Sequence, residues 1–164
     1  MKRLVLASSN PGKIREFREL LAPLGIEVIP QGELGVPDAD EPHATFVENA
    51  LVKARNAARH AKLPAMADDS GICVSALGGE PGVHSARFAG VNGPGKDAAN
   101  RRKLLQALAG VDDRQRTARF VCVIALVKDG KPVKTFRGSV QGRILDSPRG
   151  TGGFGYDPLF FHEP

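Results

Sequence analysis

Arg3-Leu-Val-Leu-Ala-Ser-Ser-Asn-Pro-Gly-Lys13 opens the chain with a short apolar run that ends in a loop of small and polar residues. Asn10 is suited to cap a helix, and Pro11 suits the first helical position, where a missing amide proton costs nothing. The apolar residues that follow recur at helical spacing, namely Ile14, Phe17, Leu20 and Leu21. The stretch therefore predicts a strand, a turn and a helix in succession.

Strand and helix patterns alternate early in the chain, and strand patterns cluster late. Further elements are predicted at 26–29 (strand), at 49–61 (helix, opened by the capping box Thr45 and Glu48) and from the acidic turn Asp68–Gly71 through Val74 (strand). Later elements are predicted from Asp97 to Gly110 (helix) and at 119–127, 133–137 and 140–145 (strands), with Asp129-Gly130 as a hairpin turn. The order predicts one α/β domain over residues 1–164, with a mixed β-sheet flanked by helices.

The composition is that of a soluble globular domain, with 41% hydrophobic residues, 25% charged residues and a net charge of +5. The basic cluster Arg101-Arg102-Lys103 lacks interleaved aromatic residues, so we expect no nucleic-acid partner. No segment approaches the ~18 consecutive apolar residues of a membrane helix, so we expect no membrane partner either. Cys73 and Cys122 lie in apolar strand patterns and are expected to be buried core thiols, which favours a reducing, cytoplasmic compartment.

The loop Ser8-Ser9-Asn10-Pro11-Gly12-Lys13 is a candidate phosphate-binding site. It places backbone amides at the start of a helix, where the helix dipole favours an anion, and it adds side-chain donors and a lysine. The spacing is not that of a P-loop. The alternative is an ordinary helix cap beside a solvated lysine.

Asp68-Asp69-Ser70-Gly71 is a candidate metal site, because magnesium is held by one or two carboxylates together with substrate phosphates and waters. A carboxylate beside the metal also orients or deprotonates an attacking water. Since neighbours in an extended chain point to opposite faces, only one of the two aspartates is expected to face a given site. The alternative is a solvated acidic turn. The nearby acids Asp38, Asp40 and Glu41 matter only if the fold brings them beside Asp69.

The segment Gly152-Gly-Phe-Gly-Tyr-Asp157 combines flexible backbone with two aromatic residues. Glycines let the main chain approach a ligand, and an aromatic face stacks on a purine. The alternative is a tight turn in which Phe154 and Tyr156 fill the core.

Taken together, these segments resemble the inosine triphosphate pyrophosphatase family, which removes non-standard purine nucleoside triphosphates. The matching stretches, in the family's order, are Ser8–Lys13, Thr45–Ala50 with Lys53-Ala54, Ala67–Gly71, Pro81–Gly90 and Gly152–Pro158. The resemblance implies an elongated mixed sheet with two lobes around a central cleft, usually in a homodimer. It also implies a magnesium-dependent reaction in which water attacks the triphosphate and releases nucleoside monophosphate and pyrophosphate.

The resemblance also assigns roles to residues. Asp69 is implied as the catalytic carboxylate and a magnesium ligand, with Glu41 as the second acidic ligand and Asp68 close by. The implied substrate contacts are Ser8, Ser9, Asn10, Pro11, Gly12 and Lys13 for the phosphate end, Phe154, Gly155, Tyr156 and Asp157 for the nucleoside, and Ser70. Arg87 is expected near the cleft.

One departure from the family pattern stands beside these expectations. Family members carry a Lys and then a Ser-His-Arg segment beyond the glycine-rich loop, and Pro164 precedes both. The segment is implied to read the 6-oxo group of the purine, so we expect weaker base discrimination without it. Two other functions stay open from the sequence: a nucleotide-binding module without turnover, and a basic nucleic-acid-binding domain.

Overall fold

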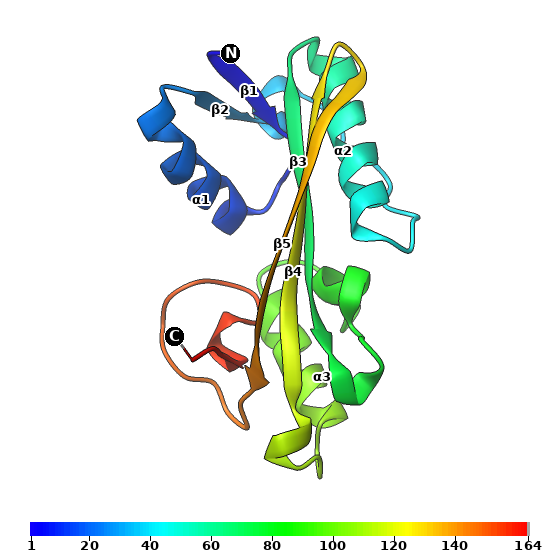
Figure 1. The fold of residues 1–164 in the computed structure, drawn as a ribbon, viewed down its shortest axis with the longest axis vertical. Coiled ribbons are helices and arrows are strands. Elements are labelled where there is room, and N and C mark those ends of the chain that lie inside the picture. Colours follow the sequence, from blue (N-terminus) through cyan, green and yellow to red (C-terminus); the bar gives the residue numbers. More distant parts are fainter. Residues whose placement is uncertain (164) are drawn as a thin grey trace. The chain divides into compact units, whose positions relative to one another are not determined.

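A computed structural model describes residues 1–163, and its strands form one mixed sheet in the order β2-β1-β3-β4-β5-β6 (Figure 1). The strands are β1 (Arg3–Leu6), β2 (Glu27–Pro30), β3 (Ala65–Val74), β4 (Thr117–Lys128), β5 (Lys131–Ile144) and β6 (Phe160–Phe161), and the α-helices are α1 (Pro11–Leu21), α2 (Phe46–Ala61) and α3 (Lys96–Ala107). β1 runs parallel to both β2 and β3, whereas β6 runs antiparallel to β5. The predicted α/β class with a mixed sheet and flanking helices is confirmed.

The chain divides into two compact units. Unit 1 comprises Met1–Asp69 and Val123–Arg137, and unit 2 comprises Ser70–Cys122 and the segment that begins at Gly138. Each unit has its own apolar core and its own share of the sequence motifs, so each is described by itself.

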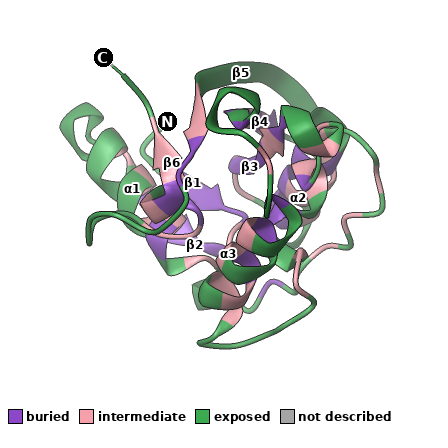
Figure 2. Cartoon of the chain, turned by 90° about the horizontal axis from the view of Figure 1, so that it is seen from below, coloured by how far each residue is buried: buried purple, intermediate pink, exposed green. Residues whose placement is uncertain are grey.

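In unit 1, α1 and α2 lie on opposite sides of β1 and β3 (Figures 1 and 2). The α1 side is filled by a cluster of larger apolar residues: Leu4, Leu6, Val28 and Met66, with Ile14, Phe17, Leu21, Ile26, Ile124 and Leu126 packed against them. The α2 side is filled by small residues, because the helix buries Ala50, Ala54, Ala57 and Ala58. Alanines allow close approach of the helix to the strands, so polar residues of α2 also come near β3.

In unit 2, α3 packs on a separate core. Its buried members are Ile72, Val74, Leu104, Leu108, Ala118, Ile144, Tyr156 and Leu159. Phe120 and Phe160 meet edge to face beside it, with ring centroids 4.6 Å apart. Arg116 is buried below this core and donates hydrogen bonds to the carbonyls of Leu108, Ile144 and Leu145 at 3.0 Å each.

Two element predictions were wrong, both because a strand continues where a break was expected. Asp68–Gly71 is not a turn but the middle of β3, and the segments predicted at 133–137 and 140–145 form the single strand β5, which ends at Ile144. Gly138, which lies between those segments, keeps a backbone conformation outside the left-handed region, so it does not break the strand. The predicted turn at Asp129-Gly130 is confirmed, and both residues have positive φ, 52° and 74°.

The cysteine prediction was right about strands and wrong about burial. Cys73 lies in β3 and Cys122 in β4, yet both are half-buried rather than core residues, and neither forms a disulfide with a described residue. Within residues 1–163, no helix has the length and apolar character needed to cross a bilayer.

Candidate active site

The loop between β1 and α1 is held by its own side chains. The Asn10 side chain caps α1, because its Oδ1 accepts from the amides of Gly12 at 2.9 Å and Lys13 at 3.3 Å. The amide of Asn10 donates to Ser8 Oγ at 3.1 Å. The predicted cap is thus confirmed, and it occupies two of the amides that the sequence offered to a phosphate. An anion at this loop would meet side-chain donors first, since Ser9 is exposed and Pro11 begins the helix without an amide proton.

Asp68 and Asp69 are both buried, with 2% and 7% of their surface exposed. Alternation along β3 places Asp68 on the side of Met66, which α1 covers, and Asp69 on the side of Ala67, which α2 covers. On the α1 side, Lys13 Nζ lies 2.8 Å from Asp68 Oδ2. On the α2 side, Lys53 Nζ lies 3.8 Å from Asp69 Oδ1. Each carboxylate therefore has a lysine from a different helix, which explains how two acids fit inside one strand.

Lys53 also joins a second acid to this group. Its Nζ lies 2.9 Å from Glu41 Oε1, so Glu41 of the loop before α2 is brought to the same ammonium as Asp69. The structure therefore brings Glu41 and Asp69 to one lysine, so the acidic loop is not merely a solvated segment. Asp38 is bound elsewhere, since it accepts from Gln31 Nε2 at 2.6 Å.

Burial raises the pKa of Asp69 from 3.8 to about 6. The Lys53 ammonium opposes that rise, the negative charge of Glu41 adds to it, and a side-chain hydrogen bond from Asn49 and the charge of Lys13 lower it. Desolvation disfavours the charged carboxylate more than these cations favour it. Asp69 is consequently more basic than an ordinary aspartate and is still mostly ionised near neutral pH.

The Asp69 side of β3 carries oxygen ligands of the kind that a divalent cation shares with a substrate. Asp68 Oδ1 and Asp69 Oδ2 are buried oxygens that no hydrogen-bond donor reaches within the described chain. A buried carboxylate oxygen without a partner is costly, and a hard cation or its water would satisfy it. Over residues 1–163, however, no three His, Cys, Asp or Glu side chains converge as a cage.

The glycine-rich loop lies in unit 2 and is fixed by hydrogen bonds. Asp157 Oδ2 accepts from the Phe154 amide at 3.0 Å, and the Tyr156 hydroxyl donates to the Ser85 carbonyl at 2.6 Å. The two aromatic residues differ in burial: Tyr156 is a core residue, whereas Phe154 is only half-buried. The core alternative therefore holds for the side chain of Tyr156, while that of Phe154 stays accessible to a ligand.

The structure also places the remaining residues that the sequence singled out, which are Ser70, Gly71 and Arg87. Ser70 is half-buried and follows Asp69 directly on β3. Gly71 lies so close to the backbone of the segment after β3 that a Cβ there would overlap the Gly82 carbonyl oxygen. Arg87 ends a short 3-10 segment, Gly82–Arg87, and its Nη2 lies 3.4 Å from His84 Nδ1.

Sequence reasoning gave no role to Lys53 and Asn49, although both belong to this site. They lie one turn apart on α2, and Asn49 is buried, with its side chain donating to and accepting from the backbone of His43. The sequence signal that would have identified them is a pair of polar residues at i and i+4 in an alanine-rich helix. The alanines define the buried face of that helix, and Asn49 and Lys53 adjoin this face.

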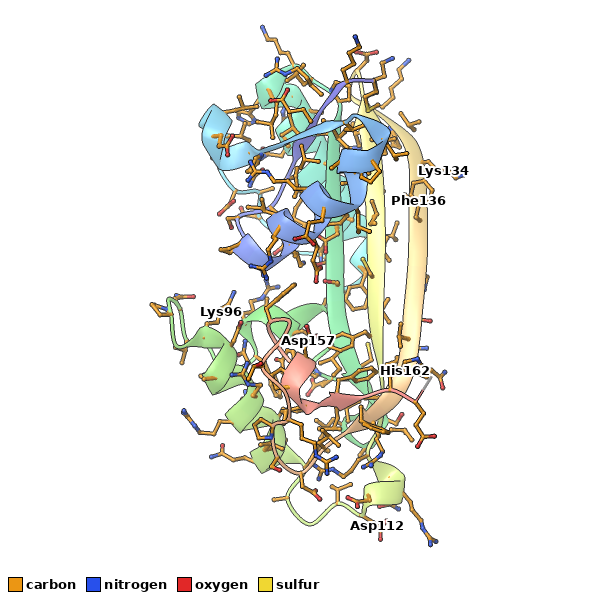
Figure 3. The ribbon with its side chains drawn as sticks, turned by 90° about the vertical axis from the view of Figure 1, so that its left-hand side faces the viewer. Lys96, Asp112, Lys134, Phe136, Asp157 and His162 are labelled. Atoms are coloured by element: carbon orange, nitrogen blue, oxygen red, sulfur yellow. The ribbon has the colours of Figure 1, made fainter. Side chains whose placement is uncertain are left out.

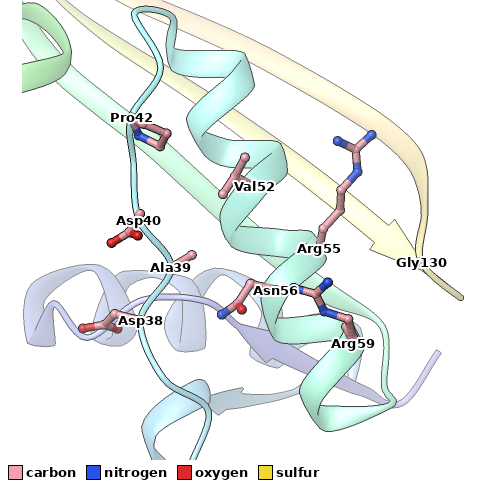
Figure 4. Close-up of a pocket in the computed structure, with 9 residues that line it drawn as sticks. All are labelled: Asp38, Ala39, Asp40, Pro42, Val52, Arg55, Asn56, Arg59 and Gly130. Carbon is pink, nitrogen blue, oxygen red and sulfur yellow. The ribbon is translucent and has the colours of Figure 1, made fainter.

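A hollow of about 740 Å³ lies against another face of α2 and is separate from the acidic group (Figure 4). Arg55, Asn56 and Arg59 line it from the helix, with Asp38 and Asp40 from the preceding loop. Both arginines are exposed, so this surface is a solvated hollow and none of the predicted phosphate ligands belongs to it.

Residues 4–164 match the Ham1 family. The chain belongs to the Ham1 family. A relative in Ralstonia nicotianae, named dITP/XTP pyrophosphatase, is 60% identical, and the match covers 98% of this chain and 80% of the relative. A relative of the same name in Bordetella pertussis is 57% identical over 98% of this chain and 76% of its own length.

Solved Ham1-family structures share the fold. A HAM1 protein from Coxiella burnetii superposes with a TM-score of 0.85 at 49% identity and covers 99% of this chain and 82% of its own. A nucleoside-triphosphatase, also named dITP/XTP pyrophosphatase, from Mycobacterium abscessus gives a TM-score of 0.76 at 41% identity, covering 98% and 83%. The family resemblance drawn from the five motifs is confirmed.

Proposed function

We propose that this chain hydrolyses non-standard purine nucleoside triphosphates, such as dITP, XTP and ITP, to the nucleoside monophosphate and pyrophosphate. The carrying observation is the buried pair Asp68 and Asp69, each beside a lysine and each with one oxygen that no described residue satisfies. Relatives named dITP/XTP pyrophosphatase are 57–60% identical to the chain. A nucleotide-binding module without turnover would have no need to keep an ionised, unsatisfied carboxylate in its interior.

The phosphate end of the substrate is assigned to the β1–α1 loop. Ser8, Ser9, Asn10 and Gly12 frame the start of α1, and Lys13 supplies a cation within the first helical turn. In the structure Lys13 is paired with Asp68, so its ammonium is already fixed in place. A preorganised cation at a helix start stabilises the charge on a phosphate chain without a cost of reorganisation.

Asp69 is assigned the role of holding and accepting a proton from the attacking water. Without a bound cation its pKa is raised to about 6, which makes it a better base than an ordinary aspartate while leaving it ionised at neutral pH. The water oxygen attacks the α-phosphorus. The bond between that phosphorus and the oxygen that bridges to the β-phosphate breaks, and pyrophosphate leaves with the electron pair of that bond. The water proton passes to Asp69, whose orientation is set by Lys53.

Magnesium is the proposed cofactor, with Asp69 and Glu41 as its protein ligands. When bound, it supplies positive charge to the phosphate oxygens and lowers the pKa of a coordinated water. Lys53 keeps both carboxylates in place, since its Nζ contacts an oxygen of each.

The nucleoside end is assigned to Phe154–Asp157. The accessible ring of Phe154 offers a face for stacking on a purine, and Ser70 offers a hydroxyl beside Asp69. Tyr156 contributes only through its backbone, because its side chain is in the core.

We also propose that the protein works as a homodimer in the cytoplasm. The dimer is supported by exposed apolar side chains on β5, where Val133 and Phe136 are 57% and 47% exposed. The compartment is supported by the two cysteines, neither of which forms a disulfide with a described residue. Figure 3 places Lys134 and Phe136 along the outer side of that strand. Sedimentation velocity of the wild type and of Phe136→Ser tests the assembly.

The decisive experiment is incubation of the purified chain with dITP and magnesium, followed by phosphorus NMR of the products. Pyrophosphate and the monophosphate in equal amounts support the proposal. Orthophosphate and the diphosphate would indicate a different cleavage, and binding without any product would leave the protein a nucleotide-binding module. Asp69→Asn serves as the catalytic control.

A further inference from the structure

One turn of α3 holds both polar groups of a single peptide residue in the glycine-rich loop. Asp97 Oδ2 accepts from the Gly155 amide at 3.1 Å, and Arg101 Nη1 donates to the Gly155 carbonyl at 2.6 Å. Asp97 and Arg101 are four residues apart, which places them on one side of the helix. We refer to Asp97 and Arg101 together as the clamp. Their two hydrogen bonds hold Gly155 firmly, because hydrogen bonds to charged groups are stronger than those between neutral groups.

We propose that Asp97 and Arg101 are positioning residues that fix the loop Phe154–Asp157 for binding of the purine base. The inference rests on the proposed function, since it concerns the base-binding end of that site. Neither residue is placed to touch the substrate; both act through Gly155.

The clamp acts on Gly155, a residue whose backbone has few steric restraints of its own. Its φ is +61°, a conformation that glycine adopts at no steric cost but leaves just as readily. Its two neighbours are tied at other points: the Phe154 amide to Asp157, and the Tyr156 hydroxyl to Ser85. With Gly155 also held, the backbone that carries Phe154 is fixed before a nucleotide arrives.

The anchor at Tyr156 is compatible with the clamp at neutral pH. Burial, with a smaller contribution from the negative charge of Asp97, raises the pKa of Tyr156 above its ordinary value. The hydroxyl therefore keeps the proton that it donates to the Ser85 carbonyl.

Two other polar residues of α3 also hold the backbone of a neighbouring loop. Asn100 is buried, and its side chain accepts from the Ala89 amide at 2.8 Å and donates to the Ala86 carbonyl at 3.1 Å. Lys103 Nζ donates to the Phe88 carbonyl and lies 4.3 Å from the centre of the Phe88 ring. Arg102 is exposed and makes no hydrogen bond or ion pair with the described residues, so it provides a matched control.

A preorganised loop binds its ligand more tightly because its ordering entropy is not lost on binding. Removing the clamp should therefore weaken binding of the nucleoside end and leave the phosphate end unchanged. A structural role for α3 would instead weaken both.

The test compares Asp97→Ala, Arg101→Ala, Asp97→Asn and the control Arg102→Ala. For the two clamp-removing variants we expect kcat/KM for dITP to fall roughly ten- to hundredfold, mainly through KM, as for a lost hydrogen bond to a charged group. Pyrophosphate affinity, measured by calorimetry with magnesium, should stay within about twofold of wild type. Asp97→Asn keeps an acceptor oxygen and should retain most of the activity.

Two results would overturn the inference: folded alanine variants with the kcat/KM of Arg102→Ala, or an equal loss of pyrophosphate affinity. If the alanine variants do not fold, Arg101→Met keeps the packing without the donors. Amide exchange at Gly155 in the wild type adds a measurement without any substitution; protection supports the clamp, and free exchange overturns it. A wild type that fails to hydrolyse dITP defeats the proposed function, and the exchange result then decides the clamp alone.

Discussion

Asp68 and Asp69 are neighbours in the chain, but they face different partners. Lys13 holds Asp68 and Lys53 holds Asp69, so a substitution at each position removes a different contact. We expect Asp69→Asn to lower kcat for dITP by ~10²-fold or more, because it removes the proposed general base while keeping its shape. Asp68→Asn should act mainly through Lys13 and raise KM. Steady-state kinetics of both variants checks this, and a near-normal kcat for Asp69→Asn would remove Asp69 from its assigned role.

The raised pKa of Asp69 also predicts a stability difference that depends on pH. Between 3.8, the ordinary value, and about 6, the folded value, the folded state binds a proton that the unfolded state has released. The free energy of unfolding contributed by this group therefore falls as pH rises through that window. Asp69→Asn lacks the titrating proton, so its stability relative to wild type should grow from near zero below the window to a plateau above it. Urea unfolding in EDTA across the pH range measures this difference, and a flat difference would contradict the assigned environment.

Residue roles were predictable where a local rule dictates them. Asn10 was expected as a cap because its spacing to the amides of Gly12 and Lys13 is set by helix geometry alone. The role of Lys53 was not predictable in that way, since its partners Glu41 and Asp69 come from a loop and from a strand. Only the packing of α2 against β1 and β3 brings those three charges together.

At the scale of elements, β3 illustrates how tertiary contacts override local preference. Adjacent aspartates disfavour a strand, yet β3 continues through them because helices on both sides bring a lysine to each carboxylate. Strand β5 is a second example, because no local signal in the sequence reveals that the segments predicted at 133–137 and 140–145 form one strand. By contrast, α1 and α2 were predictable from caps and apolar spacing, which are local signals.

Gly71 is the position in β3 where the strand allows no side chain. A Cβ there would overlap the Gly82 carbonyl oxygen and lie 2.7 Å from Ser85 Oγ. We expect Gly71→Ala to lower the free energy of unfolding by about 1–3 kcal/mol, the cost of forcing a methyl group into a packed site. Urea denaturation with Gly32→Ala as control checks this, because a Cβ at Gly32 meets nothing within 4 Å. Equal stability of the two variants would mean that the backbone near Ser85 yields easily.

At the scale of the whole molecule, the proposed substrate contacts are divided between the two compact units. Lys13 and Asp69 belong to unit 1, whereas Phe154 and its anchors belong to unit 2. Pyrophosphate carries only the part of the substrate that unit 1 is proposed to bind, and the purine is assigned to the loop in unit 2. The division therefore predicts that a substitution in unit 2 weakens binding of the nucleotide alone, whereas one in unit 1 weakens binding of the nucleotide and of pyrophosphate.

We expect Phe154→Ala to weaken binding of dITP by about 1–3 kcal/mol, the contribution of base stacking on an aromatic ring, and to leave pyrophosphate affinity unchanged. Lys13→Met should weaken both ligands, because the ammonium is proposed to act on the phosphates they share. Calorimetry with pyrophosphate and with a non-hydrolysable dITP analogue, both with magnesium, gives the four affinities. Loss of pyrophosphate binding in Phe154→Ala would show that the loop contacts the phosphate chain. Retained pyrophosphate binding in Lys13→Met would instead assign Lys13 to holding Asp68 inside unit 1, leaving the phosphates to other donors of the β1–α1 loop.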